Sequence, residues 1–220
     1  MWNYPIMPTG QMNPYNYIGY NPPTSTNPYP KFPQIDSSAF LSPFTFIIGD
    51  IIIQNNVYIA PFVSIRADEG SPFFIGSNSN IQDGVILHGL KKQYVTVNNR
   101  NYSIHIGRRV TCAHNSIVHG PCLIEDDVFV GFQSTVFNAY IKEGSFISSG
   151  AVVTNGVTLK PNSFVPPGAS IDTQEKADKL PSVPIDKEEF AKIVQKVNQE
   201  FPTSYSLLFG KNRCSCGVAW

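Results

Sequence analysis

Three of the four histidines in this sequence could share one metal ion. His114 and His119 lie five residues apart in the stretch CAHNSIVHGPC, and His88 lies upstream in VILHGL. Neutral imidazole is a common zinc ligand, and three histidines leave open the position that a catalytic zinc site needs for water. A metal held in this way lowers the pKa of its water to about 7. The alternative is that each histidine is an ordinary hydrogen-bonded surface residue. His105, directly before Ile106, is interpreted as structural.

The strongest pattern in the chain is a recurrence of aliphatic residues every six positions. A helix repeats near 3.6 residues and a strand near 2, so neither explains it. Hexapeptide repeats instead build an all-β solenoid, in which short strands alternate with tight bends around a triangular coil. The repeat positions, interrupted by two insertions and one slip, are Ile53, Ile59, Ile65, Ile75, Ile81, Leu87, Ile106, Cys112, Val118, Ile124, Val130, Val136, Ile141, Ile147, Val153, Leu159, Val165 and Ile171.

Counting along the hexads brings two of the histidines together. His88 and His119 each take the second place of a hexad and lie one coil apart, once the loop GLKKQYVTVNNRNYSI is treated as an excursion. Adjacent strands are about 4.8 Å apart, so the two imidazoles become neighbours, with Arg66 in the same column one coil earlier. His114 takes the third place, as does Asp83 one coil below, and so points from a different face or corner. Solenoids of this kind are commonly trimers, so we expect a neighbouring subunit to supply the third ligand.

Four segments follow from composition and periodicity. Residues 1–34 are rich in Pro, Asn and Tyr, and the first 30 carry no charge, which predicts a disordered tail. The alternative for this tail is an anchor that contacts an assembly partner. Residues 35–180 form the solenoid domain, residues 181–209 a linker and a C-terminal helix packed alongside, and residues 210–220 a C-terminal tail. The helix is predicted from an apolar stripe at helical spacing, formed by Phe190, Ile193, Val194, Val197 and Phe201.

The charge balance argues against several classes of partner. Lys and Arg together number 16, as do Asp and Glu, so the formal net charge is zero. A neutral chain without a basic stripe is not expected to bind nucleic acid. The start of the chain lacks the pattern of a secretory signal, and no window is apolar enough to span a membrane. We therefore expect a cytoplasmic protein.

Four motifs resemble the γ-class carbonic anhydrases, and within that family the carbonic-anhydrase-like N-terminal domain of the carboxysome scaffold protein. They are SIRADEGSPFFIG, NIQDGVILHGL, AHNSIVHGP and VGFQSTVFNA. The resemblance implies a left-handed parallel β-helix that assembles as a homotrimer with three metal sites at subunit interfaces. His88 and His119 would come from one subunit and His114 from the next. The reaction would be reversible hydration of CO2 to bicarbonate, with Zn²⁺ as the cofactor and Fe²⁺ or Co²⁺ as alternatives.

The resemblance also implies roles for individual residues near the metal. Gln82 would orient the metal-bound hydroxide, and Asn80 would hold the Gln82 amide. Glu69 would accept a proton or hydrogen bond from the metal-bound water; otherwise it is a solvated carboxylate in a turn. Asn198 in the helix would face the substrate. Three charged residues would pair across the trimer interface, where Arg–carboxylate pairs fix geometry well: Arg66, Asp68 and Asp83.

One departure from the family pattern favours a second function, and a third function also stays open. The best-studied branch carries an acidic loop after its first histidine, whereas here no carboxylate occurs between residues 91 and 122. Proton export should therefore be slower. The second hypothesis is consequently a metal-binding trimer with little or no hydratase activity that serves as a scaffold or assembly subunit. The third is a hexapeptide acyltransferase, which needs one histidine as a base and a groove for an acyl carrier; three histidines together with NIQDG argue against it.

Overall fold

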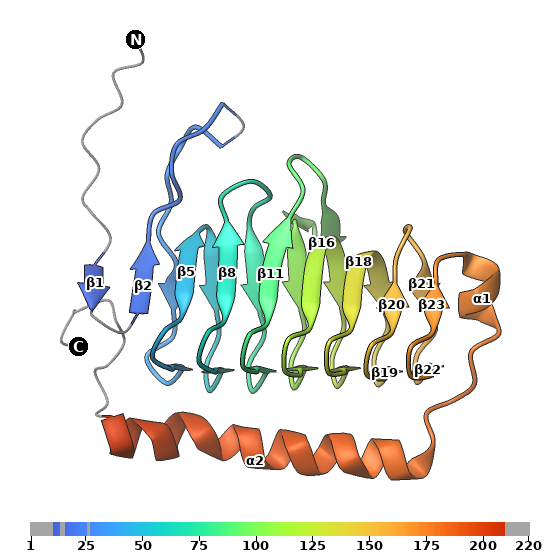
Figure 1. Ribbon diagram of the computed structural model, residues 1–220. Coiled ribbons are helices and arrows are strands. Elements are labelled where there is room, and N and C mark those ends of the chain that lie inside the picture. The colour runs from blue at the N-terminus through green and yellow to red at the C-terminus, as the bar shows by residue number, and fades with distance from the viewer. Residues whose placement is uncertain (1–10, 14–15, 26, 210–220) are drawn as a thin grey trace.

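The computed structural model describes residues 11–13, 16–25 and 27–209 as a left-handed parallel β-helix with a long helix along one side (Figure 1). Each coil has three short strands that lie on three walls, which we call A, B and C. The predicted period-six residues all point into the prism, and none of them is more than 5% exposed. The repeat therefore builds one continuous aliphatic core, and the fold class predicted from the sequence is confirmed.

Wall A carries the two neighbouring histidines. Its strands are parallel and lie side by side, one from each coil, in succession along the long axis of the molecule (Figure 1). In order, they are β2 (Asn16–Gly19), β5 (Phe46–Gly49), β8 (Ser64–Ala67), β11 (Ile86–Gly89), the first part of β16 (Ile117–Ile124), the first part of β18 (Thr135–Ile141), β20 (Val152–Val153) and β23 (Ser170–Ile171).

Wall B continues from wall A, because β16 and β18 run across the bend between the two walls. It contains β3 (Gln34–Ile35), β6 (Ile51–Ile53), β9 (Phe73–Ile75), β14 (Ile104–Ile106), the second parts of β16 and β18, and β21 (Thr158–Leu159). The insertion after β11 forms an antiparallel hairpin of β12 (Val95–Val97) and β13 (Arg100–Tyr102).

Wall C is a separate sheet. It consists of β4 (Phe40–Leu41), β7 (Tyr58–Ile59), β10 (Asn80–Ile81), β15 (Thr111–Cys112), β17 (Phe129–Val130), β19 (Phe146–Ile147) and β22 (Phe164–Val165). The chain then turns through a bend into wall A of the same coil, and we call this the C–A bend.

The bends rely on the left-handed backbone conformation. Asn and Gly tolerate positive φ better than other residues, and they supply many of the positive-φ positions. In the C–A bend, however, the first two coils place Phe44 and Phe62 in this conformation, with φ of 65° and 61°. A bulky side chain in that region costs about 1–2 kcal/mol, so these two positions are strained.

The N-terminal segment differs from the predicted tail. Residues 16–19 form β2, which pairs with β5 and places Ile18 in the core with no exposed surface. Tyr17 stacks on Phe46 with ring centroids 5.0 Å apart, and β1 (Gln11–Asn13) pairs antiparallel with β2. Terminal repeats of solenoids are atypical in sequence, which explains why periodicity did not reveal this one. Residues 1–10, 14–15 and 26 of the predicted tail, and the predicted C-terminal tail 210–220, lie outside the described residues.

Two helices follow the last coil. The short α1 (Gln174–Asp178) begins after the N-cap Thr173, and α2 (Ile185–Phe209) runs back along wall C for the length of the solenoid (Figure 1). The predicted helix is therefore confirmed, but its predicted apolar stripe is partly wrong, since Ile193 is 64% and Val197 45% exposed. Toward the solenoid, α2 buries Asn198 and Pro202 and also packs apolar side chains against the core, among them Val194 and Phe201 of the predicted stripe.

Candidate metal centre

His88 and His119 lie directly opposite each other on wall A. Strands β11 and β16 pair in parallel with His88 opposite His119, and Nδ1 of His88 is 3.1 Å from Nε2 of His119. Two nitrogens that bind the same zinc ion at 2.0–2.1 Å in tetrahedral geometry are about 3.3 Å apart. The separation of the two rings thus suits two ligands of one metal ion.

The remaining nitrogen of each ring faces an oxygen that can only accept a hydrogen bond. Nε2 of His88 lies 3.1 Å from a carboxylate oxygen of Asp68, and Nδ1 of His119 lies 3.2 Å from the carbonyl oxygen of Gly120. When neutral rings donate to both of these oxygens, the protons sit on the outer nitrogens, which leaves two lone pairs facing each other across 3.1 Å. Such an arrangement is repulsive by itself and favourable around a cation, so these residues fit a metal ion.

The environment of His119 favours its neutral, metal-binding form. Burial lowers the pKa of His119 below its usual value, and the neighbouring His88 acts in the same direction, against the opposite effect of the bond to Gly120. Ligating histidines commonly donate their second nitrogen to a carboxylate or carbonyl, which fixes the tautomer. Both histidines on wall A have that second-nitrogen partner.

Three charged side chains complete what we call the wall A half-site, defined by Arg66, Asp68, Glu69, His88 and His119. Arg66 lies opposite His88 in the register and donates to Asp68 at 3.0 Å. Asp68 is therefore held between Arg66 and His88 within one chain. Glu69 accepts a hydrogen bond of 3.3 Å from the backbone of Lys91, which brings its carboxylate to the start of the β12–β13 insertion.

The other predicted residues form what we call the bend half-site, defined by Asn80, Gln82, Asp83 and His114. Nδ1 of His114 pairs with Asp83 at 2.9 Å, and the ring stacks on Phe132 at 5.6 Å. The amide of Gln82 donates to Asn80 at 3.0 Å. The His114 side chain is 48% exposed, so its second nitrogen can point out of the chain.

The two half-sites lie at opposite ends of the wall A strands. No hydrogen bond or ion pair among the described residues joins them, and that part of the chain holds no cluster of three or more His, Cys, Asp or Glu side chains able to bind a metal. One chain therefore brings together two of the three predicted histidine ligands. The third, His114, lies at the C–A bend.

Asn198 and Gln195 show where sequence reasoning about the helix was incomplete. Asn198 is buried on α2, where its amide donates to the carbonyl of Val194 in its own helix at 2.9 Å. Gln195, one turn earlier, accepts hydrogen bonds from Asn80 at 2.8 Å and from Thr111 at 3.0 Å. Gln195 was not predicted as a site residue, because a single polar residue in a helix gives no signal without the helix orientation.

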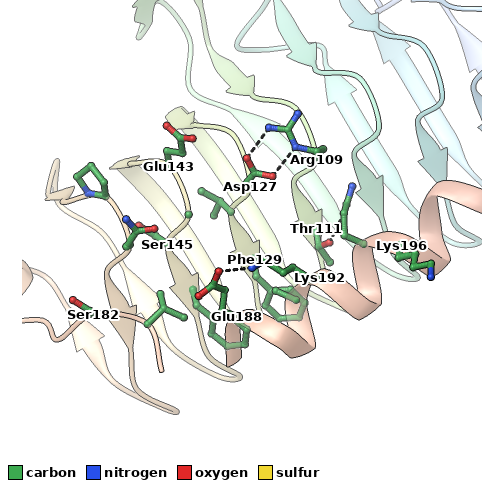
Figure 2. Close-up of a pocket in the computed structure, with 18 of the residues that line it drawn as sticks. Arg109, Thr111, Asp127, Phe129, Glu143, Ser145, Ser182, Glu188, Lys192 and Lys196 are labelled. Carbon is green, nitrogen blue, oxygen red and sulfur yellow. Dashed lines mark hydrogen bonds and ion pairs between the residues drawn. The ribbon is translucent and has the colours of Figure 1, made fainter. Parts of the chain in front are cut away.

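A groove of about 730 Å³ lies between α2 and wall C, and no histidine lines it. Figure 2 shows its ion pairs, Arg109 with Asp127 and Glu188 with Lys192, and places Thr111 on the wall C side. The groove is therefore separate from the histidines, although Thr111 and Gln195 reach its lining. None of the helices in the described segments is long and apolar enough to cross a membrane.

Comparison with known proteins first confirms the fold class. A hexapeptide transferase family protein from Anaplasma phagocytophilum superposes with a TM-score of 0.62 at 24% identity, covering 79% of this chain and 92% of that one. No family model matches the chain.

Sequence relatives then define the family. A carbonic anhydrase from Methanosarcina thermophila is 38% identical over 179 residues, which cover 77% of this chain and 72% of that protein. The carboxysome assembly protein CcmM of a Nostoc species is 44% identical over 185 residues, or 84% of this chain. The chain belongs to the γ-class carbonic anhydrase family. It spans about one third of that CcmM protein, since the match covers 33% of its length.

Proposed function

We propose that this chain is a metal-dependent carbonic anhydrase that catalyses reversible hydration of CO2 to bicarbonate. His88 and His119 of one subunit and His114 of the next would hold Zn²⁺, with Fe²⁺ or Co²⁺ as alternatives. The observation that carries the proposal is the pair of facing imidazole nitrogens, 3.1 Å apart, whose outer nitrogens both meet acceptors. His114 fits the same pattern, because Asp83 accepts from its Nδ1 and leaves Nε2 to bind.

A homotrimer is supported by the distribution of exposed apolar residues. Apart from Tyr94 in the hairpin, the large exposed apolar side chains of residues 35–180 all belong to the C–A bend or to wall A. Soluble monomers rarely gather such side chains on one side, and a heterologous ring would bury both surfaces against each other. The same contact would bring His114 of one subunit to wall A of its neighbour. The exposed apolar side chains of the C–A bend and wall A are Phe44, Phe46, Phe62, Ile86, Phe132 and Val152.

The residues around the histidines suit the hydration of a small neutral substrate. When bound, the metal would lower the pKa of a coordinated water and so supply a nucleophile near neutral pH. Glu69 would accept the proton, and Gln82, fixed by Asn80, would orient the attacking oxygen toward CO2. Asp68 would hold the His88 ring through its Nε2 while Arg66 holds the carboxylate.

The route for proton export would limit the rate. Glu69 meets the backbone of Lys91, and no carboxylate follows on the β12–β13 hairpin. Protons must therefore leave through buffer or water instead of a second acid. We expect the rate at saturating CO2 to rise with buffer concentration over a wide range.

A second candidate function is an assembly subunit with little hydratase activity. Two features favour it: the likeness to a carboxysome assembly protein, and the missing acidic group in the hairpin. In this case the metal would fix the trimer, and the N-terminal residues would contact an assembly partner in the cytoplasm.

Elemental analysis and stopped-flow CO2 hydration test both candidates on protein purified without oxygen. The variant His114→Ala should lose metal and activity but keep the β-helix, because its side chain points outward. His105→Phe is the matched control, since this histidine lies on wall B, and it should keep both. Metal-loaded protein with no activity above buffer, in reducing and oxidising conditions, would reject the enzyme and leave the assembly function. Full metal content in His114→Ala would reject the shared site.

A further inference from the structure

A row of polar side chains connects α2 to the bend half-site. Nε2 of Gln195 donates to the carbonyl oxygen of Asn78, and its Oε1 accepts from Asn80 at 2.8 Å and from Thr111 at 3.0 Å. Asn80 donates from the same nitrogen to Thr111 at 2.9 Å and accepts from Gln82 at 3.0 Å. Three amides and one hydroxyl therefore form a single chain of hydrogen bonds that ends at Gln82.

The direction of every bond in this row follows from its first member. A backbone carbonyl can only accept, so Gln195 must present its nitrogen to Asn78 and its oxygen to Asn80. Asn80 must then donate from its nitrogen and accept with its oxygen, which makes Gln82 the donor of the last bond. None of the hydrogen bonds among the described residues engages Oε1 of Gln82, so this oxygen remains as an acceptor.

Without Gln195 the row could reverse. Thr111 has a hydroxyl that can donate or accept, so it could donate to the oxygen of a flipped Asn80. Asn80 would then donate to Oε1 of Gln82, and the Gln82 nitrogen would be left over instead. Asn80, Gln82 and Thr111 are 1%, 6% and 2% exposed, so water cannot freely substitute for a lost partner. Without Gln195, both orientations of the Asn80 and Gln82 amides would satisfy the hydrogen bonds among Asn80, Gln82 and Thr111. The contact with Gln195 selects one of the two orientations.

We propose that Gln195 is a positioning residue which sets the orientation of the Gln82 amide, so that Gln82 presents an acceptor to the reaction. This inference rests on the proposed function, in which Gln82 orients the attacking oxygen. Helix α2 thereby takes part in the reaction without touching the substrate.

The variant Gln195→Met tests this, with Gln199→Met as the matched control on the next turn of the same helix. No hydrogen bond among the described residues involves the Gln199 side chain, and outside its own helix Gln199 accepts only through its backbone carbonyl, from Asn56. In Gln195→Met protein without metal, the side-chain amide NMR signals of Gln82 and Asn80 should shift and double, whereas Gln199→Met should leave them unchanged. Metal content and KM should stay as in the wild type, and kcat should fall on the order of tenfold.

The conservative variant Gln195→Glu separates orientation from packing. A carboxylate still forces Asn80 to donate, so it should restore a single set of Gln82 signals and most of kcat, even if the contact with Asn78 is lost. One unchanged set of Gln82 signals in Gln195→Met would overturn the proposal, as would an equal loss of kcat in Gln199→Met. The NMR readout needs no activity, so an inactive wild type would reject the proposed function while this test still gives its own answer.

Discussion

Replacing Phe62 by glycine should weaken the proposed trimer while leaving the fold of each chain almost as stable. Phe62 lies in the C–A bend, is 67% exposed, and has a φ of 61°. Its ring stacks on Phe44 with centroids 5.4 Å apart. Glycine removes backbone strain worth about 1–2 kcal/mol. It also loses a ring pair worth about 0.5–1.5 kcal/mol and adds about 0.5–1 kcal/mol of chain entropy. These terms nearly cancel within one chain.

The effect on assembly is much larger. A phenylalanine side chain buries about 200 Å², so the 67% that is exposed in one chain amounts to about 130 Å². At about 25 cal/mol per Å², covering this area with a neighbouring subunit stabilises the contact by about 3 kcal/mol per subunit. A loss of about 3 kcal/mol weakens each contact about a hundredfold.

Sedimentation velocity over a range of protein concentrations measures the assembly, and urea unfolding measures the fold. Phe62→Gly should dissociate at a much higher concentration than wild type, with bound metal lost in parallel. Gln133→Gly is the matched control: it lies in the C–A bend of a later coil with a φ of 55°, is exposed, and carries little apolar surface. If Phe62→Gly dissociates at the wild-type concentration, the C–A bend does not meet a neighbouring subunit and the reasoning fails.

Three further predictions concern the single chain. Burial lowers the pKa of His105. As the pH falls below about 6.5, the unfolded chain therefore takes up a proton at this histidine more readily than the folded chain, and the folded state loses stability. His105→Phe should therefore lose less stability than wild type between pH 7 and pH 5 in urea unfolding. Burial raises the pKa of Cys112 and Cys122 to about 12, so mass spectrometry should find neither alkylated by iodoacetamide at pH 8 until the protein unfolds. Leu87→Ala, at a position with no exposed surface, should lower the free energy of unfolding by about 2–5 kcal/mol in the same urea assay, and a smaller loss would mean that the core relaxes around the cavity.

The features predicted best from the sequence are those that the repeat dictates. The inward positions follow from the period of six, and the pairing of His88 with His119 follows from counting hexads. The left hand of the coil came from the family resemblance, because spacing alone carries no handedness. The proposed site could be predicted only as separate residues, since His114, the third predicted ligand, lies at the other end of the wall A strands, away from His88 and His119 of the same chain.

The features that were missed depend on contacts distant in sequence. β2 is four residues long, so no periodicity marks it, yet its pairing with β5 buries Ile18. The orientation of α2 depends on packing against wall C, where Asn198 and Pro202 are buried. The buried face therefore differs from the apolar stripe expected from spacing alone. Gln195 gains its role from that orientation, which is why the sequence did not identify it.

Helix α2 also changes how the solenoid should come apart. Near its start, the backbone of Val183 bonds to Asn162 by the last coil, and near its end Phe209 packs against Phe40 of the first. Arrays of stacked repeats tend to fray coil by coil from their ends, since each contacts only its neighbours. Because α2 and the segment just before it contact both the first and the last coil, loss of either coil would also break contacts of α2 along the whole solenoid. Melting should then occur as a single sharp event, without a population of shortened barrels.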